Sequence, residues 1–433
     1  MTTNVIQSLD PKNYYRLPWT LTDNVLGWLE PTKRCNLYCE GCYSRNDPTS
    51  DKSLAVVRSD LEVMVSRRKM DSISIAGGDP LVHPQIVEIV RMVREEFGLK
   101  PIVNTNGFAL TRQLLLALKR AGIFGFTFHV DSNQARPGWE GKTEVELNEL
   151  RMNFARMIAD VGGLSLAFNS TVYRHTIQHV PALVDWAREH IDIVHSMVFI
   201  LFRTSSQDDF DYYANGKPID VERLVYFGQD KNPEPIGTSE LVSVIREQEP
   251  EFEPCAYLGG TANPRSFKWL VSGRLGTPGK IYGYVGRRYL ELLQTGHHLL
   301  FNRYFAYASP WLLRAGRSAA ALGATFDPGS RRALRSYVKS ALFSPRRWLE
   351  TLHFQSIVVI QPIDTLADGA NDMCDGCPDM TVHQGELVWS CRLEERLQHG
   401  CLLQAVPKKR VLAPSARHLP VVPGNDGSPV PVP

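Results

Sequence analysis

The chain has 433 residues, of which 43% are hydrophobic and 22% charged, and its formal net charge is +2. This is an ordinary globular composition, long enough for one large domain and a smaller one, and the balanced charge indicates no particular class of partner. No stretch reaches the roughly eighteen apolar residues of a membrane-spanning helix, and the first residues lack the pattern of a signal peptide. We therefore expect a cytoplasmic protein.

Six short apolar segments alternate with helical patterns along the first half of the chain. The segments have the length and the β-branched content of buried strands, and they lie at residues 24–31, 71–78, 102–107, 125–132, 164–173 and 196–203. Helical patterns between them include residues 83–98, 111–122 and 180–190. This alternation predicts a parallel sheet with right-handed crossovers. In such a fold, functional residues collect at the carboxyl ends of the strands.

Three of the eight cysteines, Cys35, Cys39 and Cys42, form a C-x3-C-x2-C pattern directly after the first predicted strand. Clustered cysteines in a chain without an export signal indicate metal ligands before disulfides. A structural zinc site is the alternative, but such sites usually combine two C-x2-4-C pairs and four protein ligands. Three thiolates are one fewer than a tetrahedral metal site needs.

A glycine-rich turn, formed by Gly77, Gly78, Asp79 and Pro80, follows the second predicted strand. Two glycines allow the backbone to approach a ligand closely because no side chain intervenes. Alone, such a segment is typical of an ordinary turn. Its place after a buried strand, about 40 residues beyond the cysteines, favours a shared site.

The cysteine triplet followed by this segment resembles the radical S-adenosylmethionine (radical SAM) superfamily, over roughly residues 25–205. The resemblance implies that the triplet holds a [4Fe-4S] cluster and that residues 77–80 bind the amine of S-adenosyl-L-methionine, with Asp79 where glutamate is commoner. It also implies that the three thiolates bind three of the four irons and that the cofactor chelates the fourth. An electron from the cluster then cleaves the cofactor and releases a 5′-deoxyadenosyl radical, which abstracts hydrogen from a carbon atom of the substrate.

The same resemblance suggests further residues of the cofactor pocket. The position before the third cysteine, often aromatic in the family, is Gly41, which leaves Tyr43 as the candidate for the adenine contact. In the family, polar residues at strand ends often meet the ribose or the carboxylate. The candidates of this kind are Asn104, Asn106, Asp131 and Asn169. Each of these residue types is also common as a turn or cap after a strand.

A second group of cysteines near the carboxyl end has the pattern C-x2-C-x13-C-x9-C, and its members are Cys374, Cys377, Cys391 and Cys401. Residues 385–390 have the pattern of a short strand after a turn, which predicts a small β-hairpin lobe. Four thiolates could hold a second [4Fe-4S] cluster, which we favour, or a zinc ion. The lobe is similar to the auxiliary cluster modules of many radical SAM enzymes. Cys255 is an alternative to Cys401 as the fourth ligand, and a cluster with only three protein ligands could bind substrate.

Residues 280–349 contain twelve Lys and Arg but only two acidic residues, Glu291 and Asp327, and they are rich in aromatic and aliphatic side chains. Helical spacing predicts one apolar face that includes Tyr289, Leu292, Leu293 and Leu300. A basic amphipathic helix of this kind is typical of proteins that lie on an anionic membrane or grip a phosphate-bearing amphiphile. The alternative is a helical layer that simply packs on the barrel. We do not expect a nucleic-acid partner, because no binding motif is present.

These patterns predict an α/β fold, a partial (β/α)6 TIM-like barrel with a helical insertion and a small C-terminal cysteine-rich lobe. We expect five regions: an N-terminal extension (1–24), a radical SAM partial barrel (25–230), a basic amphipathic helical region (231–355), a cysteine-rich auxiliary cluster lobe (356–403) and a proline-rich disordered tail (404–433).

The expected function is that of a radical SAM enzyme, an oxidoreductase or transferase, that abstracts hydrogen from a lipid or other amphiphile. Modification of a ribosomally made peptide is the enzymatic alternative, and a zinc-bound membrane-surface scaffold is the alternative from another class. We expect an electron donor such as flavodoxin or ferredoxin, and peripheral contact with the inner membrane surface.

Overall fold

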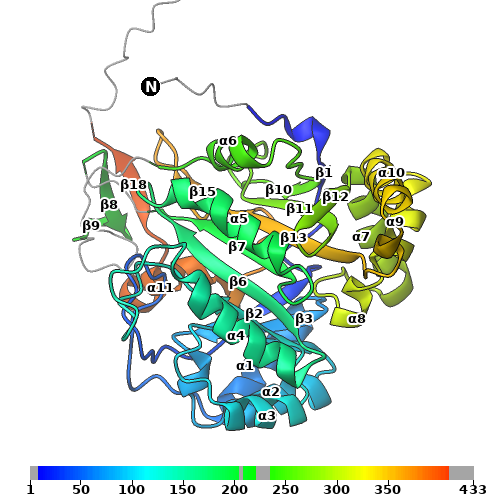
Figure 1. Cartoon of the computed structure of the whole chain (residues 1–433). Helices are drawn as coiled ribbons and strands as arrows, with labels where there is room; N and C mark the ends of the chain where they lie inside the picture. The colour runs from blue at the N-terminus through cyan, green and yellow to red at the C-terminus, as the bar shows by residue number, and fades with distance from the viewer. Residues whose placement is uncertain (1–7, 204–207, 221–234, 409–433) are drawn as a thin grey trace, which may run out of the picture.

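One eleven-stranded sheet organises the computed structural model of the chain (Figure 1), which describes residues 8–203, 208–220 and 235–408. Six of its strands are parallel and neighbours in chain order, which confirms the predicted partial barrel. They are β2 (Leu26–Thr32), β3 (Ser72–Gly77), β4 (Lys100–Thr105), β5 (Gly125–His129), β6 (Ser165–Val172) and β7 (Ser196–Leu201). All six positions of β3 are buried, as expected for a parallel strand covered on both faces.

Helices connect these strands, and two of them, α1 and α3, begin at side-chain caps. They are α1 (Leu54–Arg67), α2 (Ile86–Arg91) continued by the π-turn η3 (Met92–Glu96), α3 (Arg112–Arg120), α4 (Asn148–Val161) and α5 (Val180–Glu189). The side chain of Ser53 accepts a hydrogen bond from the Val56 N–H at the start of α1, and Thr111 accepts one from Leu114 at the start of α3. Such caps satisfy N–H groups that have no partner within the helix.

The sheet continues beyond the six predicted strands. Strand β13 (His353–Ile360) pairs in parallel with β7, and β11 (Trp269–Thr277) pairs antiparallel with β13. The remaining strands at this end are β10 (Ala256–Leu258), β12 (Lys280–Tyr284) and β1 (Tyr15–Arg16). The region 231–355, expected to be helical, is therefore helical only in part, through α6 (Thr238–Gln248) and the helices after β12.

The basic insertion forms four helices on one flank of the molecule (Figure 1). They are α7 (Arg287–Phe301), α8 (Pro310–Leu313), α9 (Gly316–Ala324) and α10 (Pro328–Phe343), followed by the 3-10 turn η5 (Pro345–Trp348). The predicted apolar face of α7 is divided, because Tyr289 and Leu293 pack on the core whereas Leu292 and Leu300 are exposed. Within the described residues, no helix is both long and apolar enough to cross a bilayer.

The cysteine-rich lobe contains the predicted β-hairpin. Strands β16 (Met380–His383) and β17 (Glu386–Trp389) are joined by Gln384 and Gly385, whose φ angles of 50° and 77° suit a tight hairpin turn. The lobe also contains β14 (Asp364–Thr365), β15 (Asn371–Asp372) and α11 (Leu393–His399). Figure 1 places α11 on the flank opposite α7–α10.

The start of the expected tail is ordered. Strand β18 (Gln404–Pro407) pairs with β8 (Phe210–Ala214), which also pairs with β9 (Lys217–Pro218). The expectation of disorder for the rest of the tail falls on residues 409–433, which lie outside the described residues.

The lobe is fastened to the first strand of the barrel through Arg68. This side chain is 2% exposed, and its guanidinium donates hydrogen bonds of 2.8–2.9 Å to the carbonyl groups of Leu21, Leu26, Cys377 and Pro378. Nearby, a Cβ atom on Gly376 would lie only 2.2 Å from the Trp19 carbonyl oxygen. The backbone that carries the rear cysteines is thus held against the residues that precede β2.

We predict that Arg68→Met lowers the free energy of unfolding by about 3–5 kcal/mol, because it leaves several buried carbonyl groups without a donor. Arg67→Met is the matched control. The neighbouring Arg67 makes only an exposed ion pair with Glu386 at 3.3 Å, so the cost should stay below about 0.5 kcal/mol. Urea unfolding of both variants measures the difference, and equal midpoints would contradict this role of Arg68.

Candidate functional site

The three front cysteines and the glycine-rich segment meet at the carboxyl edge of the sheet. Cys35, Cys39 and Cys42 follow β2, residues 77–79 end β3, and all of them line one cavity of about 270 Å³. The loop is pinned by Asn46, whose Oδ1 accepts a hydrogen bond from the Cys35 N–H at 3.0 Å and whose Nδ2 donates to the Cys35 carbonyl at 3.1 Å. The structure therefore brings the two sequence motifs into one site.

Burial raises the pKa of each of the three front thiols. For Cys39, the negative charges of Asp131, Cys42 and Cys35 raise the pKa further. Within the described residues, no three His, Cys, Asp or Glu side chains converge on a point where they could hold a single metal ion. A four-iron cube spreads its cysteine ligands over separate irons and brings positive charge to them, so these thiols fit a cluster better than a single ion.

The glycines are required by the close approach of the cysteine loop. A Cβ atom on Gly78 would lie 2.3 Å from the Arg34 carbonyl oxygen, and one on Gly77 would lie 2.2 Å from that of Thr32. Gly77 also has a φ angle of +105°, which favours glycine. The two predicted motifs thus depend on each other sterically.

The carboxylate of Asp79 is bound by the protein itself. It accepts hydrogen bonds from the Thr105 hydroxyl at 2.7 and 2.9 Å, from the Asn106 N–H at 2.8 Å and from the Leu81 N–H at 2.9 Å. Pro80 then begins the 3-10 turn η2 (Pro80–Val82). The side chain of Asp79 therefore joins the ends of β3 and β4, and Gly77, Gly78 and Asp79 line the cavity.

Tyr43 supports the glycine segment from the side. Its hydroxyl donates to the Gly77 carbonyl at 3.2 Å and lies 3.2 Å from Nε1 of Trp28, which donates to it. Burial raises the pKa of Tyr43, so the hydroxyl remains a neutral donor. The predicted adenine contact of this residue stays a prediction.

Two amides inside the barrel have no partner in the described part of the chain. The Nδ2 of Asn104 on β4 and the Oδ1 of Asn169 on β6 are buried without a hydrogen bond, and both side chains line the cavity. Buried polar groups are rarely left unpaired unless a ligand or water completes them. These two predicted residues are therefore available to a bound molecule. Asn106, also predicted, lies with its Nδ2 3.7 Å from the Cys35 Sγ.

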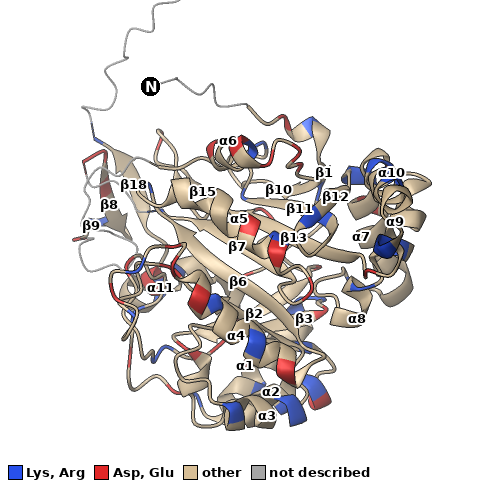
Figure 2. Cartoon of the chain, in the orientation of Figure 1, with Lys and Arg blue, Asp and Glu red and all other residues tan. Residues whose placement is uncertain are grey.

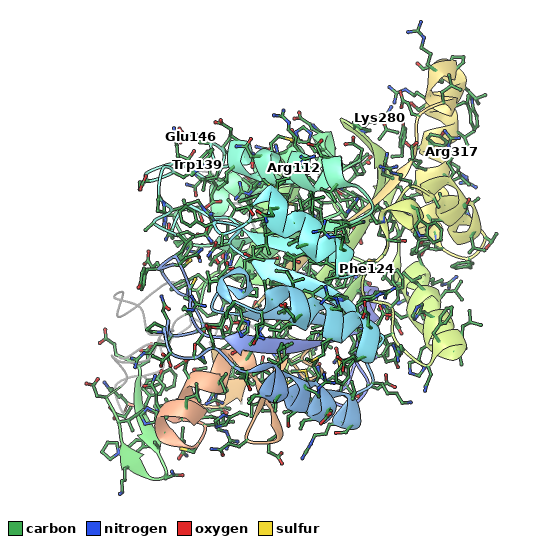
Figure 3. The ribbon with its side chains drawn as sticks, turned by 90° about the horizontal axis from the view of Figure 1, so that it is seen from below. Arg112, Phe124, Trp139, Glu146, Lys280 and Arg317 are labelled. Atoms are coloured by element: carbon green, nitrogen blue, oxygen red, sulfur yellow. The ribbon has the colours of Figure 1, made fainter. Side chains whose placement is uncertain are left out.

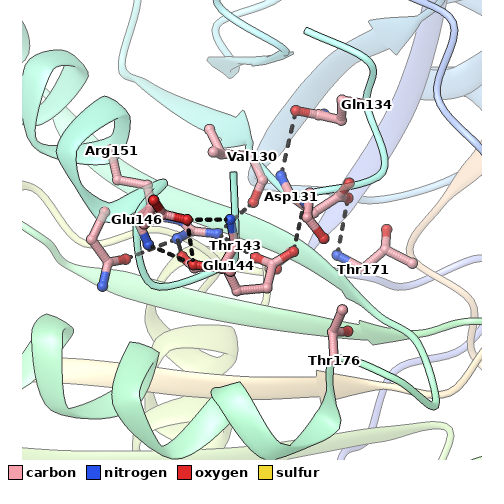
Figure 4. A network of polar contacts seen from close by, with 12 residues as sticks. Val130, Asp131, Gln134, Thr143, Glu144, Glu146, Arg151, Thr171 and Thr176 are labelled. Carbon is pink, nitrogen blue, oxygen red and sulfur yellow. Dashed lines mark hydrogen bonds and ion pairs between the residues drawn. The ribbon is translucent and has the colours of Figure 1, made fainter. Parts of the chain in front are cut away.

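Asp131 belongs to a polar network at the ends of β5 and β6 (Figure 4). Its Oδ2 lies 2.8 Å from Nε2 of His129 and accepts from the Thr171 N–H at 3.3 Å, and its own N–H donates to Gln134 at 3.4 Å. Although burial opposes ionisation, hydrogen bonding and the charge of His129 lower the pKa of Asp131. The carboxylate is held ionised at the cavity wall.

Beneath this network, the fully buried guanidinium of Arg151 donates to the Val130 carbonyl at 2.7 Å and to the Glu144 carboxylate at 2.9 Å (Figure 4). His129, which lines the cavity, was missed by the sequence analysis. Its position two residues before Asp131, at the end of a predicted strand, was the available signal.

Three of the five rear candidates lie together. Cys374, Cys377 and Cys391 line the same cavity as the front cysteines. The pKa of Cys377 is raised by its hydrogen bond with Cys374 and by burial, and that of Cys391 by burial and the charge of Cys374.

The two candidates for the fourth ligand lie elsewhere. Cys255 precedes β10, and its thiol donates to the Val271 carbonyl at 3.3 Å. Cys401 packs in a separate cluster with Phe210 and Tyr212. Neither lines the cavity. The structure therefore assembles a three-cysteine set at the rear, as at the front.

The cluster loop and the lobe are also joined by charge. Lys33, which precedes the cysteine triplet, forms an ion pair with Glu394 of α11, and the same carboxylate accepts from the Arg45 N–H at 3.2 Å. Glu394 is 3% exposed. The loop of the front cysteines and the lobe of the rear cysteines are thus linked by a buried carboxylate.

A second cavity, of about 260 Å³, continues from the first into the barrel. The two share lining residues that include Trp28, Asn104, Thr127, Asn169 and Asp379. The second cavity extends to the amino ends of the strands at Ser165, His195 and Phe354, and its walls are largely aliphatic and aromatic. A hollow therefore runs from the cysteines through the barrel.

The basic insertion closes the far end of this hollow. Leu290 and Leu293 of α7, Phe305, and Leu313 of α8 line it. Tyr307 also lines it, and its buried hydroxyl is hydrogen-bonded with Ser74 and Thr127 on the strands of the barrel. No local sequence pattern could predict this contact, because it joins segments more than 170 residues apart. Asp379, between the two cavities, has its pKa raised to about 7 by burial.

Comparisons with known proteins agree with this geometry. Residues 29–210 match the family model of the Radical SAM superfamily. GTP 3′,8-cyclase of Chlorobaculum tepidum is 29% identical over 206 residues, which are 47% of this chain and 60% of the cyclase. AdoMet-dependent heme synthase of Methanosarcina barkeri is 26% identical over 216 residues, 48% of this chain and 58% of the synthase. The chain thus spans less than two thirds of the length of these curated relatives.

Among solved structures, the crystal structure of Streptococcus suis SuiB bound to the precursor peptide SuiA is similar over 42% of this chain and 40% of that one. The sequence identity is 17% and the TM-score 0.34.

We predict that Gly78→Ala displaces the front cysteine loop, because the added Cβ would overlap the Lys33–Arg34 backbone. Anaerobic reconstitution should then lose about four irons per chain, the content of one [4Fe-4S] cluster. Gly296→Ala in α7 is the control, since no atom lies within 4 Å of its added Cβ, and it should keep the wild-type iron content. Full iron loading of Gly78→Ala would contradict the steric coupling of the two motifs.

Proposed function

We propose, from the premise that residues 29–210 form a radical SAM domain, that this chain abstracts hydrogen from an unactivated carbon of a lipid or other amphiphile. Members of that superfamily are enzymes, so the match argues against the alternative of a zinc-bound membrane-surface scaffold. The observation that supports the amphiphile is the largely apolar hollow that runs from the cysteines through the barrel to the basic insertion.

The residues at the carboxyl edge fit the cofactors. Cys35, Cys39 and Cys42 would hold a [4Fe-4S] cluster, and the glycine backbone with the unpartnered amides of Asn104 and Asn169 would bind S-adenosylmethionine. When bound, these cofactors supply a 5′-deoxyadenosyl radical, a species able to remove hydrogen from an aliphatic carbon. The chain's own part is to orient the cofactor and to exclude water from the hollow.

The walls of the hollow favour a substrate with a long apolar portion. A polar molecule in the barrel would lose its hydration without gaining enough hydrogen bonds, which is unfavourable. The polar side chains of the barrel cavity are distributed along it rather than gathered at one end; they are Ser74, Asn104, Thr127, Asn169, Ser165, His195, Ser196, Ser272, Gln294 and Ser356. An aliphatic chain would instead bury its surface at roughly 25 cal/mol per Å². We expect the aliphatic chain of the substrate to lie in the barrel and the polar end of the substrate to remain near the arginines of the insertion.

We further propose a second [4Fe-4S] cluster on Cys374, Cys377 and Cys391. Structural zinc sites use four protein ligands, and the two candidates for a fourth cysteine, Cys255 and Cys401, lie outside the cavity. A cluster held by three thiolates keeps one iron free for another ligand. A second cluster beside the first would accept or donate an electron, or hold the substrate. A flavodoxin or ferredoxin would be the external electron donor.

Modification of a ribosomally made peptide is the alternative reaction, and the solved structure of SuiB holds a precursor peptide. The two relatives named above are a GTP cyclase and a heme synthase, so a compact cofactor precursor is a further class to compare with lipids.

We predict that the ligand set of the rear cluster can be read from iron content. Cys391→Ser should reduce the iron of reconstituted protein from about eight to about four per chain while cleavage of S-adenosylmethionine by the front cluster persists. Cys401→Ser is the matched control and should keep all of the iron. If Cys401→Ser instead loses about four irons, or if wild-type protein holds only four irons and one zinc, the three-cysteine cluster is wrong.

We predict that Ala167→Phe, which projects a ring into the barrel cavity, abolishes the stimulation of 5′-deoxyadenosine formation by a lipid extract. Basal cleavage of S-adenosylmethionine should change by less than about twofold, because Ala167 lies away from the cysteines. Ala55→Phe on the exposed face of α1 is the control. Stimulation by peptides or nucleotides but not by lipids, or full lipid stimulation in Ala167→Phe, would overturn the amphiphile proposal.

A further inference from the structure

Exposed apolar side chains are concentrated on the basic insertion. Nine large hydrophobic side chains in the described residues are more than 60% exposed, and eight of them lie between residues 299 and 349. They occur at the carboxyl end of α7 (299–301), on α8 and α9, at the carboxyl end of α10 (342–343) and after η5, where Leu349 is 87% exposed. A folded chain rarely leaves so much apolar surface uncovered unless it meets another surface.

The charge of the same flank is strongly positive. Residues 280–349 carry twelve Lys and Arg against two acidic residues, and Figure 2 shows Lys and Arg positions, in blue, on the flank formed by α7, α9 and α10. One of the two acids does not reach the surface. Asp327 is 1% exposed, and its Oδ2 accepts hydrogen bonds from the N–H groups of Gly286 at 2.8 Å and Ser330 at 2.7 Å.

From this combination we infer that helices α7–α10 and η5 dock on the surface of an anionic lipid bilayer. Apolar side chains at helix ends would enter the boundary between headgroups and acyl chains, while the surrounding arginines meet anionic headgroups. A protein partner or a second copy of this chain would also cover apolar surface. The excess positive charge favours an anionic surface, and a second copy, equally positive here, would be repelled.

The inner side of helices α7–α10 also favours a lipid bilayer as the partner of this surface. Leu290 and Leu293 of α7 line the barrel hollow, whereas residues 299–301 at the end of that helix project outward. In Figure 3, Lys280 and Arg317 lie at this end of the molecule, away from Trp139 and Glu146. The proposed docking surface and the proposed substrate hollow are thus formed by one group of helices. Docking itself goes beyond the proposed reaction, because it requires neither cluster nor cofactor.

The test is flotation of the anaerobically reconstituted full chain with two kinds of vesicle. One is pure phosphatidylcholine, and the other also contains about 30% phosphatidylglycerol, which makes its surface anionic. We expect binding to the anionic vesicles only, weakened by salt. Arg332→Gln with Arg335→Gln and Lys339→Gln, all exposed on α10, should weaken binding by about tenfold or more. The control removes the same charge from the opposite part of the surface, at Arg91, Arg112 and Arg120 of α2 and α3, and should bind as wild type does.

A second pair of variants tests the apolar contribution. Leu300→Glu with Phe343→Glu should abolish vesicle binding, whereas Val56→Glu on α1 should not, and circular dichroism checks that all variants remain folded. Binding to neutral vesicles alone, no binding at low salt, or equal effects of the α10 and control triples would overturn the inference. A shift from dimer to monomer in Leu300→Glu with Phe343→Glu, without vesicle binding by wild type, would assign the surface to a second copy instead. Membrane binding without lipid-stimulated turnover would leave docking intact and refute only the proposed substrate.

Discussion

Burying a thiol group raises the free energy of its ionised form unless positive charge lies beside it, and this constraint governs the centre of the molecule. Six cysteines line one cavity; burial raises the pKa of the front three and of Cys391, and the hydrogen bond with Cys374 together with burial raises that of Cys377. An iron–sulfur cluster at the front set, and the second cluster that we propose at the rear set, would supply the missing positive charge. The rest of the fold can be understood as the scaffold that keeps these two sets of thiols close without disulfide formation.

That scaffold is a partial barrel, because its single sheet does not close on itself. The lobe covers the edge at β2, where Arg68 binds the carbonyl groups of Cys377 and Pro378, and it meets the other end of the sheet where Gly260 pairs with Cys374. Lys33 and Glu394 add a link on the cavity side. These contacts hold the lobe against the sheet at both of its ends, and the lobe contributes Cys374, Cys377 and Cys391 to the lining of the cavity.

The interior of the barrel is largely apolar, and this property connects the chemistry at one end with the surface at the other. Parallel strands covered by helices present aliphatic side chains inward, so a hollow barrel is a natural site for a hydrocarbon chain. The insertion α7–α10 then has two sides, one that lines the hollow and one that carries exposed apolar and basic residues. A single stretch of sequence thus forms both the wall of the hollow and the exposed apolar and basic surface.

The amino-acid sequence by itself determined the six parallel strands, the cysteine triplet, the glycine segment and the rear hairpin, because each depends on local periodicity, spacing or turn chemistry. It did not determine that β11 and β13 extend the sheet, that Tyr307 enters the barrel, or that Cys255 and Cys401 lie apart from the other rear cysteines. Those outcomes depend on contacts between segments far apart in the chain, whose pairing only tertiary packing decides. The division of the α7 face has the same cause: helical spacing identifies apolar positions, but the neighbouring elements decide which of them are covered.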